Sequence, residues 1–539
     1  MRISVINSMG LDSLSRTFPA LRILRENYPH SEITYFSWDK YRPLLSHMNE
    51  YIDNIRSIDP AGLVNILLSE LSADIKYKHV SEQTEQFSSF QGQDLLINFS
   101  GEDEAGLVLS TLIKAKSKKG PFLAGSGETA VMDIPGAFSH ASGLSRRFNR
   151  FNRTDVNNLL TGCMPFKRVY RPHIKLNSES DDKVMHLFHE AGINPGKEKA
   201  GIIAGSPGEN SFWGVENFSL LADMLASKFN LDIILIGRES EHPSAEQIRI
   251  QARNSSIYNF SGLVDDSMLL SLVSKLRMVI SGGHDYMYSS SLLNVPAVYL
   301  GLGCCHFREQ GPYQSNCHII TPAMDCFPCR EDFCCSHANC RKIIRPEYVY
   351  QIAKSIISGS DIPSDEIKQM KSICLYRGAF TPSGIIDYEP VEAYDIEKND
   401  LISILMFYVW ERILGLNDKN NNAIGYIKRN YRFLFDPDLL EQMMLLRIDT
   451  ANMQNRFGPG INPDIRSFSD ISGMKVSEYF EVLKGMAGIL CRSKLTGEGG
   501  SSAGSCDEEL GFIRRFLSIF LEKTDNLIDS IKQIIGIDV

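Results

Sequence analysis

Short apolar runs alternate along the chain with longer segments in which apolar residues recur every three or four positions. The first run, RISVIN, begins at Arg2 and is followed by a helical pattern over about 13–28 and by a second apolar run, EITYFSW. A further run, DLLINFSG, occupies residues 94–101. Because strands and helices that alternate in this way build parallel sheets with crossover helices, the pattern predicts a doubly wound α/β domain over residues 1–170.

The same alternation begins again at AGIIAGS, residues 200–206, and continues through a helical pattern over 215–229 and the run DIILIGRE. A helix after Pro243 and the apolar runs RMVISGG and PAVYLGLG complete this second series. We therefore expect a second Rossmann-like domain over residues 171–385, which faces the first across a cleft.

Beyond the second series the strand pattern fades and helical periods take over. Two helical runs, at 401–416 and 439–457, carry wide apolar faces that need a partner surface. The segment TGEGGSSAGS at 496–505 has the composition of a flexible linker. The pattern predicts an α-helical C-terminal region over residues 386–539.

Composition and charge narrow the possible functions. The chain has 539 residues, of which 43% are hydrophobic and 22% charged, as is usual for multidomain globular proteins. Its formal net charge of -9 gives no electrostatic reason to expect binding to nucleic acid. One basic run, SRRFNRFNR at 145–153, fits a solvated helix face or, as the alternative, a lip that faces an acidic acceptor.

The N-terminus opens directly into an apolar run, without the charged region, apolar region and cleavage site of a secretory signal. The most apolar short run, ISILMFYVW at 402–410, falls far below the roughly 18 residues of a membrane span. We expect a soluble cytoplasmic protein without a transmembrane segment. Peripheral association with the inner membrane and a homo-oligomeric state stay open.

Four loops follow directly after predicted strands. NSMGLDSLS and NFSGEDE belong to the first domain, and AGSPGENSFWG and SGGHDYMYSS belong to the second. In open α/β sheets ligands bind at the carboxyl ends of the strands, where helix N-termini offer free N–H groups to anions. A ligand that contacts loops of both domains would lie in the cleft between them.

Several of these segments resemble glycosyltransferase family 9, the ADP-heptose-type heptosyltransferases. The resemblance rests on MRISVINSMGLDSLSRTFPALRILRENYPHSEITYFSW, DLLINFSGEDEAGLVLSTLIKAK, GIIAGSPGENSFWGVENFSLLADML and NVPAVYLG, and it covers roughly residues 1–360. It implies a GT-B fold and a bacterial enzyme with a nucleotide-diphosphate sugar donor similar to ADP-heptose. Such an enzyme transfers a heptose-like sugar, with inversion, to a saccharide or protein acceptor.

The resemblance also suggests a catalytic base. Asp12 matches the base of the family when one residue is inserted after Gly10. A carboxylate in this position would take the proton from the acceptor hydroxyl. Asp12 also precedes a helical pattern as a good N-cap would, so base and cap remain alternatives. Glu102 and Asp103 are expected on the acceptor side, either as reserve bases or as first-turn acids that the helix dipole favours.

The second domain would hold the donor. The resemblance implies that the donor-binding residues are Ser206, Ser211, Trp213, Arg238, Glu239, Gly283, His284, Asp285 and Tyr288. The chain departs from the family where Ser211 replaces a lysine that meets the diphosphate and Tyr288 replaces a histidine. The small residues of the turn still permit backbone N–H contacts to phosphate. Local hydrogen bonds within the loop are the alternative role for its polar side chains.

Five of the twelve cysteines fall within CFPCREDFCCSHANC, residues 326–340. A Cys-x-x-Cys followed by further cysteines has the spacing of a thiolate cage for a zinc or iron ion in a reducing compartment. The expected ligands are Cys326, Cys329, Cys334 and Cys340, with Cys335 or His337 as substitutes. Four protein ligands close the coordination sphere, so we expect a structural ion and no metal in catalysis. Disulfides and free thiols are the alternatives.

The choice between zinc and iron stays open, because related protein-heptosylating members of the family resemble this arrangement and bind iron. Three functions also stay open. The first is the glycosyltransferase that the resemblance implies. The second is a non-catalytic descendant that binds a nucleotide sugar or a partner, which the altered donor loop favours. The third is an assembly protein that acts through its helical C-terminal region.

Overall fold

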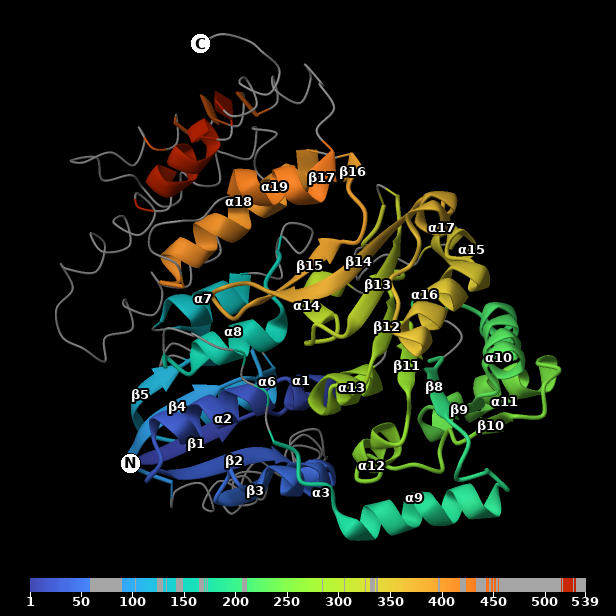
Figure 1. The fold of residues 1–539 in the computed structure, drawn as a ribbon. Coiled ribbons are helices and arrows are strands. Elements are labelled where there is room, and N and C mark those ends of the chain that lie inside the picture. Colours follow the sequence, from blue (N-terminus) through green and yellow to red (C-terminus); the bar gives the residue numbers. More distant parts are fainter. Residues whose placement is uncertain are drawn as a thin grey trace, which may run out of the picture.

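The computed structural model places two α/β domains side by side, with helices of the C-terminal region beside the first (Figure 1). It describes residues 1–58, 90–101, 103–123, 129–131, 133–141, 149–163, 169, 171, 173–205, 211–283, 285–304, 306–324, 326–329, 335, 338–395, 398–416 and 423–432, with short pieces between 443 and 529. The predicted linker at 496–505 and most of the helical run at 439–457 lie outside these residues.

The first domain contains a five-stranded parallel sheet in the order β3-β2-β1-β4-β5. Its strands are β1 (Arg2–Ile6), β2 (Glu32–Trp38), β3 (Asn54–Ile58), β4 (Gln93–Asn98) and β5 (Ala115–Lys119). The described helices are α1 (Leu11–Ser15), α2 (Phe18–Asn27), η1 (Asp39–Tyr41), α3 (Arg42–Leu45), η2 (Ser46–Met48), α6 (Glu104–Leu112), α7 (Ile134–Ala141) and α8 (Arg153–Leu160). A small ribbon adds β6 (Phe122–Leu123) and β7 (Thr129–Ala130).

The predicted helix over 13–28 is two helices. A break at Arg16 and Thr17 separates α1 from α2. Pro19 occupies the first turn of α2, where its missing N–H leaves no intrahelical hydrogen bond unmade. Proline therefore starts a new helix here instead of continuing the first.

The second domain contains an eight-stranded sheet in the order β10-β9-β8-β11-β12-β13-β14-β15. Its strands are β8 (Lys199–Ile203), β9 (Asp232–Ile236), β10 (Ile257–Asn259), β11 (Met278–Ser281), β12 (Ala297–Leu300), β13 (Cys317–Pro322), β14 (Ile373–Phe380) and β15 (Ile386–Pro390). The helices are α9 (Ser178–Glu190), α10 (Val215–Phe229), η4 (Glu239–Glu241), α11 (His242–Gln251), α12 (Leu269–Ser274), η5 (Asp285–Met287), α13 (Tyr288–Leu293), α14 (Phe307–Gln310), α15 (Asn339–Ile343), α16 (Pro346–Ser358) and α17 (Ser364–Gln369).

The predicted α/β fold class with two doubly wound sheets is confirmed. The first six strands of the second sheet are parallel, and β8, β9, β11 and β12 are buried along their whole length, as strands covered by helices on both faces must be. Antiparallel β14 and β15 extend the sheet to Pro390, beyond the predicted boundary at residue 385.

One apolar core runs through both domains. Its buried members include Leu14 and Leu21 from the first domain and Leu269, Tyr288 and Tyr313 from the second. The helix α8 lies at this junction, and each side chain from Thr154 to Leu160 is buried.

Hydrogen bonds cross the junction as well as apolar contacts. The Thr154 hydroxyl lies 2.8 Å from the Tyr288 hydroxyl, and the Tyr313 hydroxyl donates to Asp155 Oδ1 over 2.6 Å. The Ile386 amide donates to the other oxygen of Asp155 over 3.2 Å. Helix α8 therefore belongs to the first domain in sequence and to both domains in packing.

A buried ion cluster adds a third part of the chain to this junction. Arg150 Nη2 donates to both oxygens of Asp387, over 3.0 and 2.9 Å, and to the Tyr426 hydroxyl over 2.8 Å. Arg308 Nη1 donates to Asp387 Oδ1 over 2.8 Å, and the Tyr426 hydroxyl donates to Asp387 Oδ2 over 2.7 Å. Arg150 precedes α8, Arg308 lies on α14, and Asp387 lies on β15.

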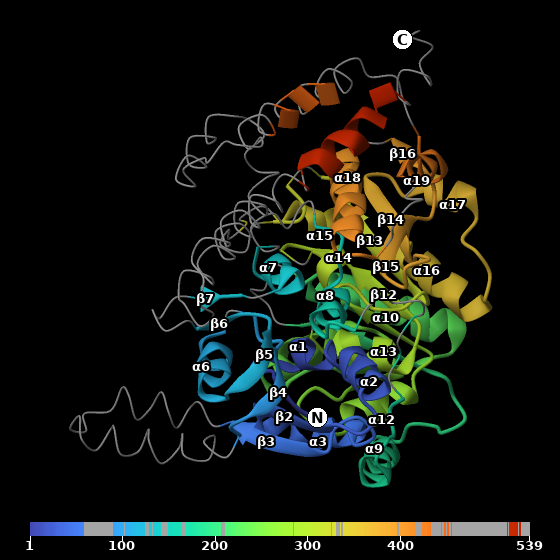
Figure 2. The ribbon, with the colours of Figure 1, turned by 90° about the vertical axis from the view of Figure 1, so that its left-hand side faces the viewer.

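The described C-terminal helices begin with α18 (Lys398–Ile413) and α19 (Ala423–Asn430), and the strands β16 (Tyr394–Asp395) and β17 (Tyr431–Arg432) pair beside them. Figures 1 and 2 both show α18 alongside α7 and α8. Trp410 of α18 makes an edge-to-face contact with Phe138 of α7, and Phe407 of α18 makes a tilted ring contact with Phe151, which precedes α8. The predicted helical character of this region is confirmed for α18 and α19.

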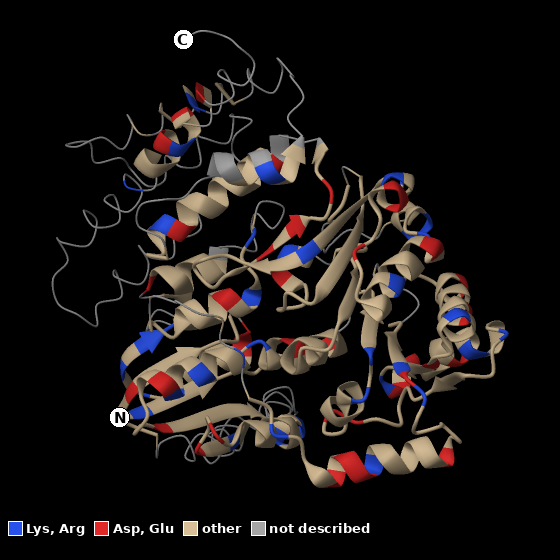
Figure 3. Ribbon diagram, in the orientation of Figure 1, with Lys and Arg blue, Asp and Glu red and all other residues tan. Residues whose placement is uncertain are grey.

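Lysine, arginine, aspartate and glutamate are interspersed along the described helices, as α9 and α10 illustrate (Figure 3). In the part of the chain that the structure describes, every helix is too short or too polar to cross a membrane.

The buried carboxyl of Glu411 on α18 predicts how stability depends on pH. Burial raises the pKa of Glu411 from 4.5 to about 7. The negative charge of Asp387 adds to this increase, whereas a hydrogen bond with Ser383 opposes it. At a pH between 4.5 and about 7, Glu411 is therefore protonated in the folded protein but ionised in the unfolded chain. The free energy of unfolding should therefore fall as pH rises through this window, by about 3 kcal/mol from Glu411 alone.

The Glu411→Gln variant should lose this part of the pH dependence, because an amide does not titrate. Denaturant unfolding at about pH 4.5 and about pH 7.5 measures it for the wild type, for Glu411→Gln and for Glu347→Gln, an exposed carboxyl on α16, as the control. An equal loss of stability in the wild type and in Glu411→Gln would contradict the assignment.

Candidate functional site

Both sheets reverse their strand order at one point, between β1 and β4 in the first domain and between β8 and β11 in the second. The loops after these four strands are the four that the sequence singles out. Doubly wound folds bind ligands at such switch points, at the carboxyl ends of the strands. The two switch points meet across the domains, because α1 contacts η5 and α13, which follow the loop after β11.

Asp12 lies in the first turn of α1, directly beside this contact. Its Oδ2 accepts a hydrogen bond from Arg16 Nε over 2.7 Å, and 27% of its side chain remains exposed. The N-cap of α1 is Gly10, without any side-chain cap. The alternative role of Asp12 as a helix cap is therefore wrong, because the helix begins one residue before it.

Arg16 is buried between the domains, with 3% of its side chain exposed. Its Nη2 donates to the Gln310 carbonyl of the second domain over 2.6 Å, and its Nη1 donates to Asn152 Oδ1 over 3.3 Å. Its guanidinium carbon lies 4.6 Å from the centroid of the Tyr288 ring. Burial alone would lower the pKa of Arg16, but the Asp12 carboxylate raises it above its ordinary value. Arg16 is thus a charged group that links Asp12 to the second domain.

Asp103 is the N-cap of α6, where it accepts a hydrogen bond from the Gly106 amide over 3.1 Å. The Ser8 hydroxyl also donates to it, and Ser8 in turn contacts the Ser100 hydroxyl at 2.9 Å. These bonds join the loops after β1 and β4. Of the two alternatives for Asp103, the structure supports a role at the start of the helix. Glu102 lies outside the described residues.

Several predicted donor residues lie in the interior of the second domain. Trp213 is buried, and its indole N–H donates to the Ile344 carbonyl over 2.8 Å. Tyr288 is buried against Thr154 and Arg16. The backbone of Ser211 lies close to Gly282, since a Cβ atom added to Gly282 would come within 2.7 Å of the Ser211 carbonyl oxygen. The two loops therefore touch, as a shared site requires.

The turn after β11 contains Gly283, whose φ of 89° favours glycine. Asp285 follows it and forms an ion pair with Arg238 of the loop after β9. Both side chains of this pair are more than 40% exposed. Ser206 and His284 lie outside the described residues.

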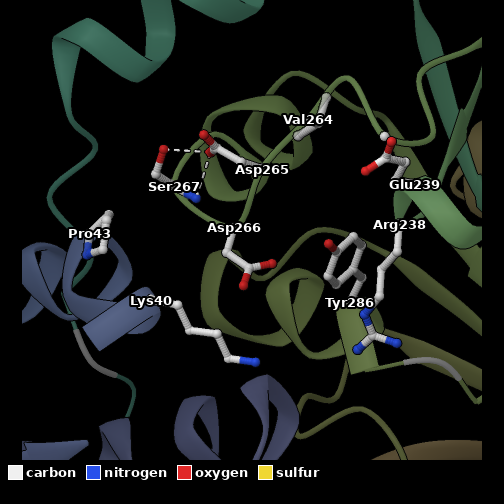
Figure 4. Close-up of a pocket in the computed structure, with 10 residues that line it drawn as sticks. Lys40, Pro43, Arg238, Glu239, Val264, Asp265, Asp266, Ser267 and Tyr286 are labelled. Atoms are coloured by element: carbon white, nitrogen blue, oxygen red, sulfur yellow. Dashed lines mark hydrogen bonds between the residues drawn. The ribbon is translucent and has the colours of Figure 1, made fainter. Parts of the chain in front are cut away.

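A pocket of about 380 Å³ lies where the two domains meet (Figure 4). Its lining residues come from the loop after β2 in the first domain and from the loops after β9, β10 and β11 in the second: Lys40, Pro43, Arg238, Glu239, Gly262, Val264, Asp265, Asp266, Ser267 and Tyr286. Of the predicted donor residues, Arg238 and Glu239 line it. Its volume and its position at the strand ends are those of a small-molecule site.

Asp266, Tyr286 and Lys40 also line this pocket and were not among the predicted site residues. Burial raises the pKa of Asp266, whereas a hydrogen bond with Tyr286 and the charges of Arg238 and Lys40 lower it. The guanidinium carbon of Arg238 lies 5.5 Å from the centroid of the Tyr286 ring. The signal available in the sequence was the position of GLVDDS directly after the third strand of the domain. Lys40 likewise follows the apolar run EITYFSW, but nothing in the sequence indicates that it meets a loop of the other domain.

The described cysteines of the segment follow β13 in the chain, and Cys304 follows β12. Burial raises the pKa of the Cys329 thiol to about 11, and the neighbouring thiols of Cys326, Cys340, Cys335 and Cys304 contribute to the shift. All five are free thiols.

Two further contacts order this segment. The Cys329 amide donates to the Gly303 carbonyl over 2.9 Å, and the Ala338 amide donates to Cys335 Sγ over 3.3 Å. Cys334 and His337 lie outside the described residues, and among the residues that are described no three ligand side chains converge as a metal site requires.

The sequence matches no protein-family model and no curated protein. The fold is similar to that of a glycosyltransferase family 9 protein from Veillonella parvula DSM 2008, at a TM-score of 0.54 and 18% identity, over 67% of this chain and 98% of that chain. E. coli ADP-heptose LPS heptosyltransferase II follows with a TM-score of 0.49 and 14% identity, over 67% and 99% of the two chains.

E. coli heptosyltransferase WaaC with ADP has a TM-score of 0.46 and 12% identity, over 66% of this chain and 100% of that chain. At 18% identity, the similarity to the Veillonella protein shows the fold. The predicted GT-B arrangement of two facing Rossmann-like domains is thus confirmed.

Proposed function

We propose that this chain is a glycosyltransferase that takes its sugar from a nucleoside diphosphate. The observation that carries the proposal is the position of Asp12, partly exposed at the carboxyl edge of the first sheet, on a helix that contacts the donor-side loop of the second domain. The pocket at the same interdomain edge supplies a place for the nucleotide. The GT-B fold supports the proposal, because it places the donor and the acceptor on opposite sides of one cleft.

In the proposed reaction, the oxygen of the acceptor hydroxyl attacks the anomeric carbon of the sugar while Asp12 takes the proton from that hydroxyl. The bond between that carbon and the diphosphate breaks on the opposite face, which inverts the configuration. Backbone N–H groups at Gly282 and Gly283 would stabilise the leaving diphosphate, since the chain has no lysine at Ser211. The Arg16 hydrogen bond orients the Asp12 carboxylate.

The proposed donor is an ADP-heptose-like sugar or another nucleoside-diphosphate sugar, and the proposed acceptor is a saccharide or a protein. Arg238 and Glu239 are assigned to donor binding because they line the pocket. Ser206, Ser211, Gly283, His284 and Asp285 remain predicted donor-binding residues. Trp213 and Tyr288 support the site from the interior.

A protein that binds a nucleotide sugar without transferring it is the second candidate. The ion pair between Asp12 and Arg16 favours this candidate, because the Arg16 guanidinium already engages Oδ2 of the proposed base.

We also propose a structural zinc or iron ion at the cysteine segment, held by four thiolates from Cys326, Cys329, Cys334 and Cys340. The proximity of the described thiols to Cys329 supports this metal site. Cys335 or Cys304 would serve as a ligand in place of one of these four cysteines. The ion would stabilise the segment between β13 and α16.

The Asp12→Asn variant tests the assignment of the base. Asparagine keeps the shape of the side chain but cannot accept the proton, so transfer should fall by roughly 100-fold or more, while affinity for the nucleoside diphosphate changes little. Transfer to saccharide and protein acceptors and calorimetric titration with nucleotide measure the two quantities.

The Glu26→Gln variant is the matched control, because it removes another i,i+4 pair with an arginine, on α2 of the same domain. Its transfer rate should stay near that of the wild type. If Asp12→Asn transferred sugar at the wild-type rate, Asp12 would not be the base. Binding without transfer by the wild type would instead favour the second candidate.

The metal proposal predicts about one zinc or iron ion per chain in protein purified without added metal. Cys329→Ser should lower both the metal content and the melting temperature, whereas Cys374→Ser, on β14, should leave the metal content unchanged. Elemental analysis and thermal unfolding measure these effects. Wild-type protein that carries no metal and whose thiols all react freely would refute the proposal.

A further inference from the structure

The strand order of the second domain indicates where the phosphates, the ribose and the base of a nucleotide would each bind at the carboxyl ends of the strands. In Rossmann-like domains the phosphates bind at the turn after the first strand, and an acidic residue at the end of the second strand binds the ribose hydroxyls. Here the first strand is β8 and the second is β9, which is followed by Glu239 at the pocket. The base should therefore lie beyond Glu239, against the loop at 262–267 that follows β10.

This part of the pocket brings a carboxylate, Asp266, and an ammonium group, Lys40, together beside the hydroxyls of Ser267 and Tyr286. Figure 4 shows the Asp266 carboxylate facing both the Lys40 ammonium and the Tyr286 ring. Asp266 belongs to the loop after β10, whereas Lys40 reaches the pocket from the first domain. The adjacent Asp265 differs from Asp266, because its Oδ1 accepts bonds from the amides of Ser267 and Met268 over 2.9 Å. The Asp266 carboxylate has a hydrogen bond with Tyr286, which leaves further lone pairs on its two oxygens for a ligand.

We propose that this pocket selects guanine, so that the donor is a guanosine-diphosphate sugar, with Asp266 and Lys40 as the residues that read the base. The inference rests on the proposed function, which it makes specific in its nucleotide.

The chemistry of the four bases distinguishes them at such a pair. Guanine presents two adjacent donors, N1–H and N2–H, which match the two oxygens of a carboxylate, and next to them the acceptor O6, which matches an ammonium. Adenine presents the acceptor N1 beside its single amino donor, and cytosine has the same order of donor and acceptor. Uracil offers one N–H between two carbonyl oxygens. These three bases would each place an acceptor against Asp266.

Calorimetric titration of the full-length protein with GDP, ADP, UDP and CDP tests the proposal. A bidentate pair of this kind discriminates between bases by about 10-fold to 100-fold, so GDP should bind tighter than each of the others by that factor. Lys40→Gln should weaken GDP binding by about 10-fold or less, because its contact with O6 is exposed to solvent.

Asp266→Asn provides a sharper test, because it changes the hydrogen-bonding pattern while keeping the shape. An asparagine amide no longer accepts from both donors of guanine, but its oxygen and its N–H match N1–H and O2 of xanthine. The variant should lose about 10-fold to 100-fold in affinity for GDP and gain affinity for xanthosine diphosphate. Asp365→Asn, an exposed carboxyl on α17, is the matched control and should leave all affinities unchanged.

The outcomes separate this inference from the proposed function. Tighter binding of GDP, lost in Asp266→Asn and replaced by binding of xanthosine diphosphate, would support the inference. Equal or tighter binding of ADP, unaffected by Asp266→Asn, would overturn the guanine assignment and leave the proposed glycosyltransferase intact. If none of the four nucleotides bound, both proposals would fail.

Discussion

Two buried guanidinium groups that share one buried carboxylate link the two α/β domains to each other. Arg150 belongs to the first domain, whereas Arg308 and Asp387 belong to the second. Tyr426 of the C-terminal helix α19 donates to the same carboxylate. Although burial alone would raise it, the two arginines lower the pKa of Asp387 to about 2, so the carboxylate stays charged at neutral pH. An unpaired guanidinium in the interior costs several kcal/mol, and each arginine therefore requires the same arrangement of the three segments.

The candidate site depends on this arrangement. Asp12 projects from the first domain, but the group that orients it, Arg16, is held by the Gln310 carbonyl and by the Tyr288 ring of the second. The pocket likewise needs both domains to form its wall, since Lys40 follows a strand of the first domain and Asp266 follows a strand of the second. The junction thus determines the distance between the pocket and Asp12.

Sequence patterns predicted most of what depends on neighbouring residues. The buried parallel strands and α10 followed from apolar periodicity, and the four loops followed from the rule that places ligands at strand ends. Long-range contacts were not predictable in this way. Tyr288 carries no sign in the sequence that Thr154 covers it, and Asp266 and Lys40 are separated by more than two hundred residues. The strands β14 and β15 were missed because their antiparallel pairing at a sheet edge lacks the long apolar run of a buried strand.

The apolar core that continues from one domain into the other has a consequence for how the protein unfolds. Leu14 and Leu269 belong to the same cluster of buried side chains, so neither sheet can lose its helices without exposing apolar surface of the other. Two-domain chains with separate cores melt in two steps, whereas a shared core couples the halves into one cooperative unit. Heating should therefore produce a single calorimetric transition for the two α/β domains, whose enthalpy corresponds to both domains together.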